Sequence, residues 1–71
     1  ARAGDQGLQQ RYSQAYPIAT ELTASLGLRG FRLNLAVEGS TSYADLAALA
    51  PKIRDAVGEA KYARLETALF H

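Results

Sequence analysis

Apolar residues recur at helical spacing in the first third of the chain. Over residues 5–26 they step by four, three, four, three and four positions, so they fall on one face of a helix. Asp5 is expected to cap this helix, and Gly27 to end it in a left-handed conformation from which Leu28 packs back. Pro17 predicts a kink, or a division into two helices. The apolar positions are Leu8, Tyr12, Ala15, Ala19, Leu22 and Leu26.

The second half of the chain shows the same spacing after a loop at 39–41. Ser42 followed by Asp45 is a variant of the capping box and predicts a helix start. Pro51 predicts a second kink, and Gly58 separates this helix from a final one. The inward positions are expected to be Tyr43, Leu46, Ala50, Ile53, Val57, Tyr62, Leu65 and Leu69.

The segment 31–37 is ambiguous between helix and strand. Apolar residues alternate with Arg32, Asn34 and Ala36, which is a strand pattern. Leu, Asn and Ala are poor strand formers, however, and the chain has no second strand-like run to pair with this one. A helix is therefore favoured. The fold class is all-α, a single domain over 1–71 with four to five short helices and a flexible lead at 1–4.

Composition limits the chemistry that this chain can supply. Its 71 residues include no cysteine, and the one histidine is the last residue. The seven carboxylates are scattered, at 5, 21, 38, 45, 55, 59 and 66. Neither a nucleophile with its base nor a metal-ligand cluster is recognisable. We expect a protein that is not an enzyme and holds no cofactor or metal. No apolar run reaches 18 residues, so no membrane span is expected either.

A surplus of apolar residues favours a protein–protein interaction or assembly module. Hydrophobic residues make up 48% of the chain, more than a small bundle buries readily once the two-sided segment 28–37 is included. The partner is expected to be another protein chain or a second copy. The predicted contact residues are Tyr16, Leu28, Phe31, Leu33, Leu35 and Val37.

A dimeric DNA-binding protein is the alternative. A strand at 31–37 followed by two helices is similar in element order to a ribbon-helix-helix repressor, in which paired strands enter the major groove. Arg32 and Asn34 are residue types that read guanine and adenine edges. Separately, Arg29 lies inside the tetrapeptide Gly27–Gly30, which has the GxxG pattern of the loop that clamps a nucleic-acid backbone in a KH module. The net charge of +1 gives this alternative little support.

Overall fold

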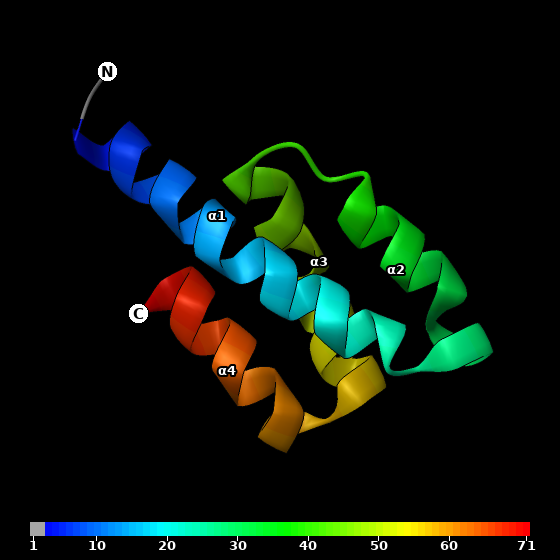
Figure 1. The fold of residues 1–71 in the computed structure, drawn as a ribbon. Helices are drawn as coiled ribbons and strands as arrows, with labels where there is room; N and C mark the ends of the chain where they lie inside the picture. The colour runs from blue at the N-terminus through cyan, green and yellow to red at the C-terminus, as the bar shows by residue number, and fades with distance from the viewer. Residues whose placement is uncertain (1–2) are drawn as a thin grey trace.

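The computed structural model describes residues 3–71, with side chains from Gly7 onward, and its regular structure there is entirely helical (Figure 1). The all-α expectation is confirmed, and the segment 31–37 is helical rather than extended. The elements are α1 (Ala3–Ala24), η1, a turn of 3-10 helix (Gly27–Gly30), α2 (Phe31–Glu38), α3 (Tyr43–Val57) and α4 (Glu59–Phe70).

The first helix begins earlier than the sequence predicts. Ala3 and Gly4 belong to α1, and the flexibility predicted for 1–4 stays a prediction. Residues 1 and 2 of that lead lie outside the described residues. Asp5 is the third residue of α1 rather than its cap. Alanine has the highest helix propensity, so it is favourable for the helix to extend to Ala3.

Both prolines lie inside uninterrupted helices. Pro17 is within α1 and Pro51 is within α3, so Pro17 does not divide its helix in two. Each proline ring is exposed, which leaves solvent beside the backbone whose hydrogen bond proline removes. The kinks predicted at Pro17 and Pro51 stay predictions.

The core lies where α1, α3 and α4 meet, and α2 covers one side of α1 and α3. Figure 1 shows α1 running across the bundle between α2 and α4, with α3 behind it. The predicted stripes supply most of this core, although Leu8 is exposed. The buried apolar residues are Ala15, Ala19, Leu22, Val37, Leu46, Ala50, Ile53, Tyr62, Leu65 and Leu69.

Local polar contacts fix the helix ends as the sequence predicts. The Ser42 hydroxyl accepts from the Asp45 amide at 3.3 Å, and the Asp45 carboxylate accepts from the Thr41 amide at 3.2 Å. Gly58 has φ +89°, in the left-handed region that favours glycine, and separates α3 from α4. The two last helices are therefore packed neighbours joined through one glycine.

Candidate interaction surface

Two glycines set the path of the chain from α1 into α2. Gly27 has φ +63°, and the helix ends before it, as predicted. Gly30 is buried where the turn crosses the end of α1. A Cβ on Gly30 would lie 2.5 Å from the Leu26 Cβ and 3.0 Å from the Thr23 carbonyl oxygen. Only a glycine permits this close approach, which brings α2 back against α1.

One face of α2 is attached to α1. The Asn34 side-chain amide donates to the buried Thr23 hydroxyl at 2.9 Å. Val37 is fully buried in the core, and it is the only buried residue of α2. Just beyond the helix, the Tyr12 hydroxyl donates to the Ser40 carbonyl at 2.7 Å. These contacts determine which side of α2 faces outward.

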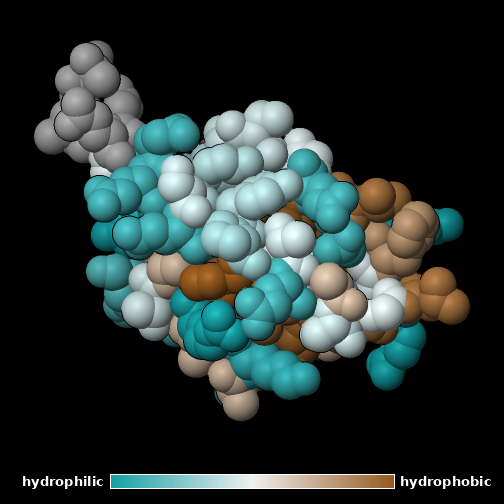
Figure 2. All heavy atoms as spheres, viewed as in Figure 1, coloured by the Kyte–Doolittle hydropathy of each residue, from teal (hydrophilic) through white to brown (hydrophobic). Residues whose placement is uncertain are grey.

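The outward side carries an apolar stripe made of Leu28, Phe31 and Leu35. These three side chains are 94%, 57% and 51% exposed. They are three and four residues apart, and the Phe31 amide donates to the Leu28 carbonyl, so they follow one another along η1 and α2. Figure 2 shows hydrophobic residues gathered at the right-hand edge of the molecule, where η1 and α2 lie. The three exposed side chains of the stripe thus belong to one edge of the molecule.

A groove between α2 and α3 adjoins this stripe. Its volume is about 370 Å³, and its lining combines apolar and basic side chains. Among the described residues, the ion pairs are Arg54 with Asp55 and Arg64 with Glu21, so the three basic residues of the groove are in neither. The α2–α3 groove is lined by Arg29, Arg32, Leu33, Ala36, Leu49 and Lys52.

The structure brings together only half of the predicted contact residues. Leu33 packs partly on the core while lining the groove. Val37 is at the opposite side of α2, inside the core, so it is not available to a partner. Tyr16 is half-buried on α1, where its ring is 5.6 Å from that of Tyr12. The alternation that suggests one common face for these residues belongs to a strand, whereas the helix spreads them around its axis.

Leu28 differs from its expected packing. The sequence predicts that it folds back on α1 after Gly27, but it is almost fully exposed. The chain continues from Gly27 into a 3-10 turn, and this turn directs Leu28 away from the bundle. This departure from the usual helix ending produces one end of the stripe.

Among the described residues, the structure does not contain the strand that the DNA-binding alternative needs to contact base edges. The strand it requires at 31–37 is α2. Asn34, expected to read a base edge, instead donates to Thr23. Arg29 and Arg32 do lie together beside the groove, but on a short helix packed on a bundle rather than on a ribbon. The specific geometry of a ribbon-helix-helix dimer is therefore absent from the described residues.

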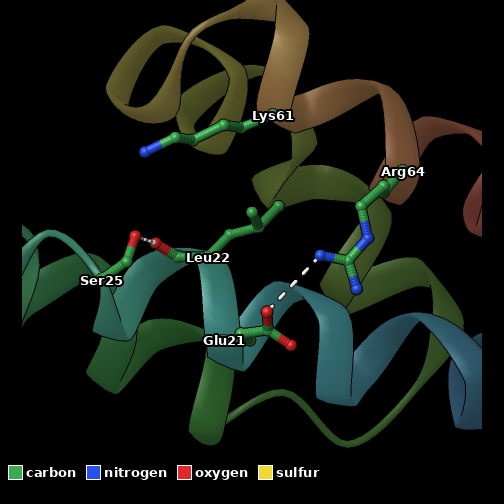
Figure 3. A pocket seen from close by; sticks show the side chains of 5 residues that line it. All are labelled: Glu21, Leu22, Ser25, Lys61 and Arg64. Carbon is green, nitrogen blue, oxygen red and sulfur yellow. Dashed lines mark hydrogen bonds and ion pairs between the residues drawn. The ribbon is translucent and has the colours of Figure 1, made fainter.

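A second hollow, smaller than the groove, lies on another part of the surface. A cleft of about 240 Å³ between α1 and α4 contains the Glu21–Arg64 ion pair, at 3.4 Å (Figure 3). Ser25 in the same cleft donates to the Leu22 carbonyl at 2.6 Å. In the described part of the chain, no three His, Asp or Glu side chains gather as a metal site would require. None of its helices is long and apolar enough to cross a membrane.

Sequence reasoning missed the contribution of α3 to the surface. Leu49 packs partly on the core, but neither it nor Lys52 is among the predicted inward positions, and their place in the groove depends on α2 lying beside them. Their spacing of three residues places them on one side of α3. That spacing is a signal only once the position of α2 is known.

Comparison with known proteins adds no constraint on this surface. Neither a protein-family model, nor a curated protein, nor a solved structure matches the chain significantly.

Proposed function

We propose that this chain is a small non-catalytic interaction or assembly module that buries the apolar stripe against another protein chain or a second copy. The observation that supports it is the cluster of Leu28, Phe31 and Leu35 on the outer side of a helix whose inner side is packed. Exposed apolar clusters of this kind are typical of protein interfaces.

The energetic argument follows from the exposed area. Full burial of a Phe or Leu side chain is worth roughly 1.5–3 kcal/mol, and these side chains are half or more exposed in the isolated chain. A few such anchors commonly dominate a small interface. Covering the stripe with a partner therefore contributes favourable free energy to association.

The test compares apolar truncations inside and outside the stripe. Phe31→Ala and Leu35→Ala should each weaken association, whereas Leu8→Ala should not, although Leu8 is a similarly exposed leucine of α1. Sedimentation of the purified protein measures self-association, and affinity capture from the native source measures another partner. Thermal unfolding checks that each variant folds, since surface substitutions change stability by about 0.5 kcal/mol or less.

The proposal fails if all three variants fold and associate as the parent does. It also fails if Leu8→Ala weakens association as much as Leu35→Ala, because the stripe would then have no special role.

A further inference from the structure

Resting on the proposed function, we infer that the partner is an acidic amphipathic helical segment of another protein, which lies along the apolar stripe with its carboxylates at the α2–α3 groove. The argument comes from the charges beside the stripe. They distinguish an acidic partner from a second copy and from a partner recognised by apolar contact alone.

Three basic residues of this chain lie together at the groove. Arg29, Arg32 and Lys52 line the groove, out of eight basic residues in the chain. The rest of the chain then holds five basic residues against seven carboxylates and is net acidic. A chain with a net charge of only +1 thus carries a local excess of three positive charges beside its exposed apolar cluster.

None of these three cations belongs to an ion pair among the described residues. The carboxylates of the ion pairs that are present, Asp55 and Glu21, do not line the groove. Glu38 is the only carboxylate of η1 and α2, and it lies six residues after Arg32, a rise of about 9 Å along the helix. A carboxylate from a partner would therefore meet unpaired guanidinium groups, which bind carboxylates with paired hydrogen bonds.

The same charges disfavour a symmetric pair of this chain. A two-fold contact centred on α2 would place two copies of Arg32 near each other, with Arg29 and Lys52 close by. Like charges brought together at an interface cost free energy and suppress the wrong partner. An acidic partner would avoid this repulsion, and its carboxylates would be attracted to the same three positive charges.

The shape of the groove favours a peptide over a flat surface. The hollow of about 370 Å³ is at the lower end of ligand-sized sites, roughly 300 Å³ and above, and Leu33, Ala36 and Leu49 give it an apolar part. A helix with apolar residues three and four apart can cover the stripe and place a side chain in the groove. A membrane surface could cover Leu28 and Phe31 but would leave the groove unfilled.

The test uses synthetic helical probes of about four turns. The acidic probe has leucines three and four apart with glutamates between them, and the control probes replace the glutamates by glutamine or by lysine. Fluorescence polarisation should show saturable binding of the acidic probe that weakens between about 0.05 and 0.5 M salt. The glutamine and lysine probes should bind at least about tenfold more weakly.

Variants locate the contact. Arg32→Glu and Phe31→Ala should each weaken the acidic probe by about tenfold or more, whereas Lys61→Glu, an exposed charge reversal on α4, should not. Arg32 and Lys61 are both exposed, so the two reversals make matched changes in net charge. Thermal unfolding of each variant checks that the fold is retained.

Several results would overturn the inference while leaving the proposed function intact. One is that all three probes bind equally and that only Phe31→Ala, not Arg32→Glu, weakens their binding. Another is that the parent chain forms a dimer that Phe31→Ala dissociates. Absence of saturable binding of the acidic probe up to about 1 mM also overturns it. So does binding to phosphatidylserine vesicles, but not to the acidic probe, that is lost on Arg32→Glu. Failure of the proposed function itself is different, because Phe31→Ala and Leu35→Ala would then change no association at all.

Discussion

The close approach at Gly30 allows a stability change to be predicted from geometry. Gly30→Ala would place a methyl carbon 2.5 Å from the Leu26 Cβ and 2.6 Å from its Cδ1. Carbon atoms in favourable contact are about 3.5–4.0 Å apart, so the overlap is at least about 1 Å. The Leu26 Cβ is fixed to the backbone and cannot rotate away, so η1 itself has to shift.

Overpacking of this kind costs about 1–3 kcal/mol. In a domain of this size each kcal/mol lowers the melting temperature by roughly 4–8 °C. We therefore expect Gly30→Ala to lower the melting temperature of the parent by several degrees, as measured by circular dichroism. Urea unfolding of the same variant gives the free energy directly.

Two other glycines provide matched controls. Gly7 lies within α1, where an added Cβ would meet nothing within 4 Å, so Gly7→Ala should stabilise the helix by about 0.5–1 kcal/mol. Gly27→Ala also meets nothing within 4 Å but sits at φ +63°, which costs about 1–2 kcal/mol in a residue with a Cβ. If Gly30→Ala proves as harmless as Gly7→Ala, the close approach described for η1 is incorrect.

Three further predictions concern the core and its polar contacts. Leu65→Ala removes a fully buried side chain and should cost about 2–5 kcal/mol in urea unfolding; a loss below about 1 kcal/mol would contradict its place in the core. Asn34→Ala leaves the Thr23 hydroxyl without its donor and should cost about 1 kcal/mol in the same assay, whereas an unchanged free energy of unfolding would mean that this hydrogen bond contributes nothing. Burial raises the pKa of Tyr62 above its ordinary value of 10.0, with the charge of Glu66 adding to the rise. The unfolded chain then ionises first, so stability is complete below about pH 10 and falls as the pH rises above it. Thermal unfolding at about pH 9 and pH 11 should show a larger loss for the parent than for Tyr62→Phe, and equal losses would refute the assignment.

The sequence predicts the helices better than it predicts the surface between them. Spacing alone identifies the inward residues of α4, because one face of that helix is buried and the other is wet. The position of α2 depends instead on Gly27 and Gly30, whose effect on the chain path is not encoded in apolar periodicity. The sequence places Val37 on the contact surface for this reason, since nothing local says which side of a two-turn helix meets the bundle.

The candidate groove shows the same limit. Arg29 and Arg32 stand out in the sequence as basic residues near an apolar segment, but Lys52 does not, because it is distant in sequence. Charge beside an exposed helix becomes visible only when tertiary packing brings α3 next to α2. The sequence therefore predicts a contact surface around 28–37, but it does not predict which residues of α3 complete the groove.

The small number of buried residues in α2 has a consequence for the dynamics of the fold. Val37 is its only buried side chain, whereas α3 and α4 each bury three. Amide protons of α2 should therefore exchange with solvent through local opening, at a lower free energy than those of α3 and α4. A partner that covers the stripe would slow this exchange selectively, because it would stabilise α2 against local opening.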